Sequence, residues 1–211
     1  TDALEFLAEA GLRVHKPNPR QYQAEVPDLP ELGIIFQRPG DIVVSVRQGS
    51  IDFGIAGIDL IEEKRGGNGD ILLLHDSLGF GYCLLALAIP ETWNDVVDMP
   101  SLQKYSQSLN RPLRVATKFP ILTERFLSKY DIPHTLIAAE GTLETAPTIG
   151  YADIISDLVS SGQTLKDNRL RQLPDGVIQR SQAALIANKK TLQTRPEVLE
   201  VARRLLEYIE A

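Results

Sequence analysis

The chain has 211 residues, of which 43% are hydrophobic and 24% are charged, a composition typical of a globular protein with a sizeable core. Its 28 acidic residues outnumber its 22 Lys and Arg, and the net charge of −6 argues against general nucleic-acid binding, which needs a basic surface. Cys83 is the only cysteine, which excludes an internal disulfide framework. No hydrophobic run approaches the roughly 20 residues of a membrane-spanning helix, so no membrane association is expected.

The first part of the chain predicts short helices alternating with short strands. Apolar residues recur at helical spacing between residues 4 and 12, and Gly11 is a typical helix-ending residue. Several prolines between residues 13 and 36 favour hairpin-like strands and turns, and a helix over 42–48 is expected to end at Gly49. Further strands are expected at 34–36, 52–55, 71–74 and 82–89, and a further helix at 60–64.

A polar stretch at 90–110, with a short helix and loops, is followed by a second set of helices and strands. Strands are expected at 113–117, 135–138, 152–158 and within 177–187, helices at 121–130, 162–168 and 196–209, and a short helix or turn at 142–149. Short strands alternating with helices predict an α/β fold. Two α/β lobes in one chain predict a cleft between them, which is a common position for small-molecule sites.

Residues 157–165 read DLVSSGQTL, which predicts a phosphate-binding loop. A tight glycine turn between a strand and a helix exposes backbone N–H groups, and the helix N-terminus adds further donors. The hydroxyls of three residues add side-chain donors, and Gly162 allows an anion close to the backbone. These hydroxyl residues are Ser160, Ser161 and Thr164. The alternative is a plain helix start, with one serine as the cap and Asp157 as a turn residue.

A longer run around this loop carries a family resemblance. Residues 141–168, GTLETAPTIGYADIISDLVSSGQTLKDN, closely resemble the signature segment of the ATP phosphoribosyltransferase family. Residues 53–59 (FGIAGID) and 115–120 (VATKFP) resemble two further segments of that family, in the same order and spacing. The resemblance covers essentially the whole chain, and its long segment is highly specific.

The resemblance implies a bilobal fold of two α/β domains, similar to type II periplasmic binding proteins, with the active site in the interdomain cleft. The first domain would comprise residues 1–89 and 186–211. The second, which carries the phosphoribosyl pyrophosphate loop, would comprise residues 90–185. Because the chain opens with a helix and no initiator methionine, the family's first strand and its Lys/Gly/Arg loop are expected to lie outside this sequence.

The resemblance also implies a reaction. In this family N1 of ATP attacks C1 of phosphoribosyl pyrophosphate and pyrophosphate leaves, which is the first step of L-histidine biosynthesis. Such chemistry needs positioning and charge stabilisation rather than a protein nucleophile. Mg²⁺ is the expected cofactor, bound mainly through the substrate phosphates. His15, His75 and His134 are scattered and predict no metal site of their own.

Roles for individual residues follow from the matching segments. Glu144 and Asp157 would be catalytic, holding the ribose hydroxyls and favouring positive charge on the sugar. The loop would bind the 5′-phosphate through Ser160, Ser161, Gly162, Gln163, Thr164 and Leu165. Possible cleft residues elsewhere are Arg38, Gly57, Asp59, Lys118 and Asp153. Simpler interpretations are an acid at a helix start for Glu144, a surface acid for Asp153 and a solvated lysine for Lys118.

The end of the chain bears on partners. The family's long form continues into a histidine-binding domain, whereas this chain stops after the helix at 196–209. It is therefore expected to be the short form, which works with a regulatory subunit similar to histidyl-tRNA synthetase. Catalytic-subunit dimers would assemble with that partner into a larger hetero-oligomer. With no signal peptide at the start of the sequence, the expected compartment is the cytoplasm.

Three other functions stay open at this point. The same bilobal fold serves small-anion binding proteins that do no chemistry, and fold alone does not determine function. A different phosphoribosyltransferase is a second alternative, although such families usually place a pair of acids before the phosphate loop, and here Ser156 precedes Asp157. The third is an interaction partner with weak catalysis, if the first loop is truly lost.

Overall fold

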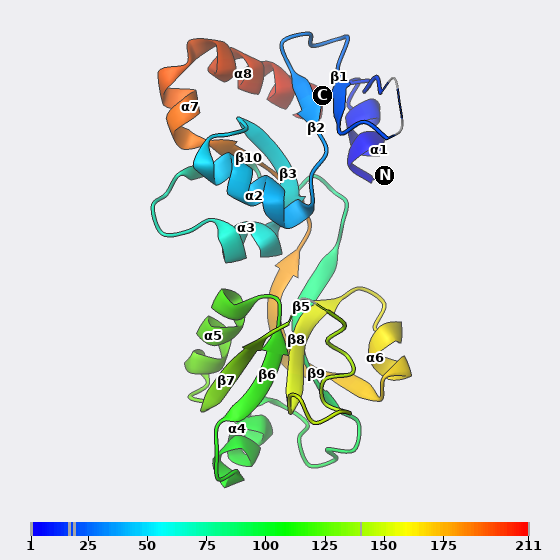
Figure 1. The fold of residues 1–211 in the computed structure, drawn as a ribbon, viewed down its shortest axis with the longest axis vertical. Coiled ribbons are helices and arrows are strands. Elements are labelled where there is room, and N and C mark those ends of the chain that lie inside the picture. Colours follow the sequence, from blue (N-terminus) through cyan, green and yellow to red (C-terminus); the bar gives the residue numbers. More distant parts are fainter. Residues whose placement is uncertain (1, 17, 19, 140, 211) are drawn as a thin grey trace. The chain divides into compact units, whose positions relative to one another are not determined.

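The computed structural model describes residues 2–16, 18, 20–139 and 141–210 (Figure 1). The chain divides into two compact units, one running to Gly81 and resuming at Gln182, the other comprising Tyr82–Ser181. The sequence predicts these limits at 89/90 and 185/186. Strand pairing accounts for the difference at the first limit, because β5 (Cys83–Pro90) pairs along its length within the second unit. The mixed α/β class is confirmed.

The first unit is built on a three-stranded antiparallel sheet in the order β3-β10-β4. Its strands are β3 (Phe53–Gly57), β4 (Ile71–His75) and β10 (Ala183–Asn188). The central strand β10 is buried at every position, because it has a neighbour on both edges and helices on both faces. A separate antiparallel pair is formed by β1 (Gln23–Glu25) and β2 (Gly33–Ile35), as the prolines and turns predict.

Helices cover both faces of this sheet. The helices of the unit are α1 (Asp2–Glu9), α2 (Pro39–Gln48), α3 (Ile58–Lys64), α7 (Lys189–Thr194) and α8 (Pro196–Glu210). One face of β10 packs with α2 and α3, and the other packs with α1 and α8. The predicted end of α2 is confirmed, since Gly49 adopts the left-handed conformation (φ 74°) that glycine favours.

The second unit contains a five-stranded mixed sheet in the order β7-β6-β8-β5-β9. Its remaining elements are α4 (Met99–Ser108), β6 (Leu113–Thr117), α5 (Pro120–Lys129), β7 (His134–Ala138), β8 (Ile154–Val159), α6 (Gln163–Asp167) and β9 (Leu170–Ser181). β6 runs parallel to β7 and β8, whereas β5 runs antiparallel to β8 and β9. One hydrophobic cluster takes residues from α4 and α5, and a second takes residues from α6 and from the segment 142–150.

Residues 142–149 form turns, in line with the predicted short helix or turn. Two other features were not predicted. The stretch 177–187 contains the predicted strand as β10, but it also contains the end of β9, which belongs to a different sheet. The helix α7 was not expected because its sequence, KKTLQT, has no apolar periodicity, and the side chain of Asn188 supplies its start instead.

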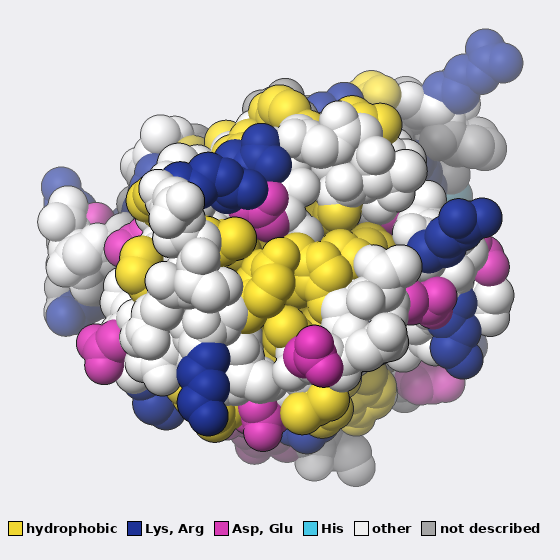
Figure 2. All heavy atoms as spheres, turned by 90° about the horizontal axis from the view of Figure 1, so that it is seen from below, with side chains coloured by type: hydrophobic (Ala, Val, Ile, Leu, Met, Phe, Trp, Pro, Cys, Tyr) yellow, Lys and Arg dark blue, Asp and Glu magenta, His cyan; other side chains and the backbone are white. Residues whose placement is uncertain are grey.

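Surface charge is mixed where it can be seen. The face viewed from below in Figure 1 gathers hydrophobic side chains at its centre, with Lys, Arg, Asp and Glu side chains dispersed around them (Figure 2). That face therefore carries no large patch of only positive or only negative side chains. Within the described residues, no helix combines the length and the apolar character needed to cross a membrane.

Candidate functional site

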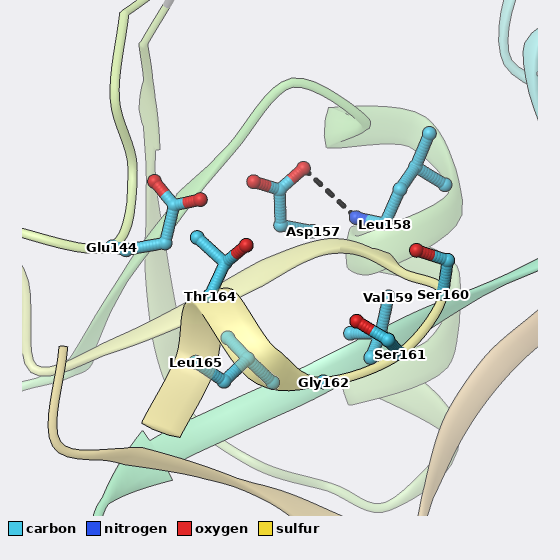
Figure 3. Close-up of a pocket in the computed structure, with 9 residues that line it drawn as sticks. All are labelled: Glu144, Asp157, Leu158, Val159, Ser160, Ser161, Gly162, Thr164 and Leu165. Atoms are coloured by element: carbon cyan, nitrogen blue, oxygen red, sulfur yellow. Dashed lines mark hydrogen bonds between the residues drawn. The ribbon is translucent and has the colours of Figure 1, made fainter. Parts of the chain in front are cut away.

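A small pocket of about 60 Å³ lies where β8 ends and α6 begins, entirely within the second unit (Figure 3). At roughly 10–15 Å³ for each water-sized sphere, it has room for about four to six waters. Its walls come from one turn residue and from a single stretch of the chain, residues 157–165 without residue 163. The lining residues are Glu144, Asp157, Leu158, Val159, Ser160, Ser161, Gly162, Thr164 and Leu165. The two predicted carboxylates and most of the predicted loop thus meet in one place.

Gly162 sets the shape of the loop. It has φ 73°, in the left-handed region, and stands directly before the first residue of α6. A Cβ atom at this position would meet only Val159, at an ordinary 3.9 Å, so the need for glycine is conformational rather than a matter of space. The serine-cap alternative is wrong in detail, because Gly162 itself is the N-cap residue, and Ser161 Oγ only accepts a local hydrogen bond from the Gln163 N–H at 3.3 Å.

Not every predicted loop residue faces the pocket. Gln163 lies on α6, where its side-chain amide donates to Asp167 Oδ1 at 2.7 Å, and it does not line the pocket. Leu165 does line the pocket, but its side chain is buried and packs in the hydrophobic cluster beneath the loop. Leu158 and Val159 line the pocket but were missed, because apolar residues of a strand carry no sequence signal for a ligand site. The polar candidates left in the loop are the hydroxyls and the backbone N–H groups.

Asp157 lies within β8 rather than at its end. It is the register partner of Ala86 in β5, and the strand continues for two more residues. Burial raises the pKa of Asp157, and the negative charge of Glu144 adds to that increase, although the Leu158 N–H and the charge of Lys118 oppose it. Leu158 N donates to Asp157 Oδ1 at 2.8 Å. The carboxyl group of Asp157 therefore holds a proton more readily than an ordinary aspartate.

Glu144 reaches the pocket from the turn segment 142–150. The residue before it, Leu143, is fully buried and anchors the turn in the core. Figure 3 places the carboxylates of Glu144 and Asp157 on the same side of α6 as Thr164. Two carboxylates facing one pocket are suited to hold hydroxyl groups and to favour a neighbouring positive charge.

Two other candidates of the second unit have different surroundings. Lys118 is exposed in the turn between β6 and α5, close enough to Asp157 for their charges to interact. Asp153 precedes β8, at the end of the strand away from the pocket, and forms ion pairs with Arg111 (2.6 Å) and Arg114 (2.9 Å). Burial opposes its ionisation, but hydrogen bonds from both arginines hold the pKa of Asp153 well below its usual range. Through these ion pairs, Asp153 links the start of β8 to the start of β6.

The remaining candidates belong to the first unit. Arg38 is exposed directly before α2, Gly57 is the N-cap residue of α3, and Asp59 is buried in the first turn of that helix. The glycine with the tighter surroundings in this segment is Gly54, where a Cβ atom would lie 2.5 Å from Ile42 Cγ2. Across the described residues, no group of three or more His, Cys, Asp and Glu side chains is arranged to hold a metal ion.

Comparison with known proteins gives consistent results. The family model described as "HisG: ATP phosphoribosyltransferase" matches residues 38–210. ATP phosphoribosyltransferase 2, chloroplastic, from Arabidopsis thaliana is 44% identical over 214 residues, which cover 100% of this chain and 52% of that protein. ATP phosphoribosyltransferase from Brucella ovis is 36% identical over 98% of this chain and 92% of its own length. The chain thus spans about half the length of the plant relative.

A solved structure has the same fold. A chain of the ATP phosphoribosyl transferase (HisG:HisZ) complex from Thermotoga maritima matches with a TM-score of 0.71 and 23% identity. The match covers 99% of this chain and 92% of that one. At this identity the likeness concerns the fold.

Proposed function

Because this chain belongs to the ATP phosphoribosyltransferase family, we propose that it transfers the phosphoribosyl group of phosphoribosyl pyrophosphate to N1 of ATP and releases pyrophosphate. This is the first step of L-histidine biosynthesis. The observation that carries the proposal is the pocket in which Glu144 and Asp157 meet the loop 160–165. That pocket combines donors for a phosphate with acceptors for sugar hydroxyls.

In this proposal, hydrogen-bond donors of the loop bind the phosphate and the two carboxylates bind the sugar. The hydroxyls of Ser160, Ser161 and Thr164, together with loop N–H groups, donate to the 5′-phosphate. The ionised carboxylates of Glu144 and Asp157 accept from the ribose hydroxyls and favour the positive charge that develops on the sugar as pyrophosphate leaves. None of these steps uses a protein nucleophile, so holding the two substrates in line is the main contribution.

Mg²⁺ is part of this proposal. It would bind mainly through the phosphates of the substrates, since Mg²⁺ dehydrates reluctantly and is commonly held by substrate phosphates and waters. When bound, the ion supplies charge neutralisation at the departing pyrophosphate.

We also infer that the chain acts as the catalytic subunit of a hetero-oligomer with a regulatory subunit similar to histidyl-tRNA synthetase. The support for this inference is the structural match to a chain of a HisG:HisZ complex. The proposed assembly contains dimers of the catalytic subunit. The proposed compartment is the cytoplasm, with the plastid as the alternative because of the chloroplastic plant relatives.

The test is an assay of the full chain with ATP, phosphoribosyl pyrophosphate and Mg²⁺, with and without the regulatory subunit. Formation of phosphoribosyl-ATP that requires both substrates would support the reaction, and stimulation by the partner would support the assembly. Thr164→Ala should weaken use of the sugar donor while leaving the fold intact. Binding of phosphoribosyl pyrophosphate in a calorimeter, without turnover in any mixture, would instead favour a small-anion binding protein. Turnover with a different nitrogen acceptor would indicate another phosphoribosyltransferase.

A further inference from the structure

Three hydroxyl side chains form a buried chain beneath the sheet of the second unit. Thr117, Thr123 and Ser156 are each fully buried. The Thr123 hydroxyl lies 2.8 Å from the Ser156 hydroxyl and 3.2 Å from that of Thr117. The chain continues to the backbone, since Phe119 N donates to Thr117 Oγ1 at 2.9 Å. Burying hydroxyls is costly unless they are paired, and a buried polar network whose members are all paired makes the elements it joins rigid.

These residues come from three different elements. Thr117 is the last residue of β6, Ser156 is its register partner in β8, and Thr123 lies in the first half of α5. The hydroxyl chain therefore joins two parallel strands to the helix that covers them. It also contacts the turn between β6 and α5, because Thr117 Oγ1 accepts the hydrogen bond from Phe119 N.

The next residue along each strand belongs to the site. Asp157 follows Ser156, and Lys118 follows Thr117. Because successive side chains of a strand point to opposite faces, Ser156 points toward α5 while Asp157 points toward the pocket. The hydroxyl chain thus lies on the far side of the sheet from the pocket and acts on it through the backbone.

We propose that the Thr117–Thr123–Ser156 hydroxyl chain is a positioning device that holds Lys118 beside Asp157. It sets where the lysine stands relative to the carboxylate, and touches no substrate itself. The consequence for catalysis rests on the proposed function, whereas the placement of Lys118 does not. Two charges face Asp157 across the site: Lys118, which favours its ionised form, and Glu144, which opposes it.

The test uses Thr123→Val, which keeps the shape of the side chain but removes the shared hydroxyl. In the full chain, the pKa of Asp157 should be followed by NMR of its carboxyl carbon. If the hydroxyl chain holds Lys118 in place, Thr123→Val should raise the pKa of Asp157 by most of the shift that Lys118→Gln produces. In the double variant Thr123→Val, Lys118→Gln, the pKa of Asp157 should rise little more than in the single variant with the larger increase. Thr123→Ser, which keeps the hydroxyl, should give the wild-type pKa of Asp157.

Controls separate positioning from stability. Ser106→Ala removes another buried hydroxyl in the same unit, one that donates to Gln103 O within α4, and should leave the pKa of Asp157 unchanged. Ser156→Ala provides a second break in the chain should Thr123→Val fail to fold. An unchanged Asp157 pKa in a folded variant that lacks the hydroxyl contact would overturn the proposal.

Kinetics provide the second readout. Displacement of site groups by an ångström lowers turnover by up to about 100-fold, so Thr123→Val should lose kcat within that range while Ser106→Ala keeps it. The proposed function and the proposed positioning of Lys118 can fail independently. Absence of turnover in the wild-type chain would argue against the proposed reaction. The NMR titration of Asp157 would still decide whether the hydroxyl chain positions Lys118.

Discussion

Replacing Asn188 with alanine should destabilise the first unit far more than the loss of one side-chain contact suggests. Asn188 is only 5% exposed and connects two helices. Its amide nitrogen donates to Val46 O at 2.8 Å, near the end of α2, and its Oδ1 accepts from Thr191 N at 2.9 Å, at the start of α7. Alanine would remove both contacts, although Val46 O would keep the hydrogen bond that it accepts from Gly49 N at 3.0 Å.

The magnitude follows from those two losses. Loss of a helix N-cap costs about 1 kcal/mol, and loss of one hydrogen bond costs about 0.5–1.5 kcal/mol. Together they predict that the free energy of unfolding falls by about 1.5–2.5 kcal/mol. For a chain of this size, 1 kcal/mol corresponds to about 2–4 °C in the midpoint, so the first unit should melt about 3–10 °C lower.

Thermal unfolding, monitored by circular dichroism, checks this prediction. If the two units unfold in separate transitions, the midpoint of the first unit can be measured directly. Asn188→Asp keeps an acceptor for the cap but loses the donor to α2, which divides the two contributions. Asn168→Ala is the matched control, since Asn168 is only partly buried and its amide makes one hydrogen bond, to Thr164 O. A midpoint for Asn188→Ala within 2 °C of the wild type would refute the reasoning.

Three further predictions concern packing, the site and pH. Gly54→Ala should cost about 1–3 kcal/mol, because its new Cβ would lie 2.5 Å from Ile42 Cγ2; denaturant unfolding should show the loss, and Ile42→Ala should recover part of it. Asp157→Asn should lower kcat/KM by about 100-fold or more at unchanged stability. In the wild type, the fall in rate on the acid side of the pH profile should occur above pH 3.9, which is about the pKa of an ordinary aspartate, because burial raises the pKa of Asp157. Asp153→Asn should cost about 2 kcal/mol at neutral pH, since hydrogen bonds to charged groups are worth about 1.5–3 kcal/mol. Because the pKa of Asp153 is lowered in the folded state, the loss of stability caused by Asp153→Asn should be full above about pH 4 and should shrink as the pH falls further. A loss of stability that does not depend on pH would argue against the ion pairs of Asp153 with Arg111 and Arg114.

The sequence predicts most elements of the fold because hydrophobic period and helix ends are local signals. The strand at 113–117 and the end of α2 at Gly49 appear where expected. The division of 177–187 into β9 and β10 could not be predicted, because it depends on pairing with strands that lie far away in sequence.

The candidate site shows the same division. The loop hydroxyls and Gly162 are recognisable from the sequence because their residue types at that spacing match a phosphate-binding turn, whereas the roles of Glu144 and Asp157 follow only from the resemblance of their segment to a known family. The outward direction of Gln163 depends on its position on α6, and the pairing of Asp153 depends on arginines far along the chain. The buried hydroxyls of Thr123 and its partners leave no trace in the sequence pattern, since serine and threonine are ordinary at such positions.

The register of β5 with β9 makes the second unit a self-contained insertion. Cys83 and Ser181 are paired neighbours, so the segment enters and leaves this unit at adjacent points. A piece of chain whose ends meet can be excised, or its ends joined and reopened elsewhere, with little disturbance of its interior. Residues 82–181 should therefore fold when expressed alone and carry the whole phosphate pocket with them. Such a fragment would let the sugar-donor half of the reaction be studied by itself, and a failure to fold would show that the unit depends on the rest of the chain.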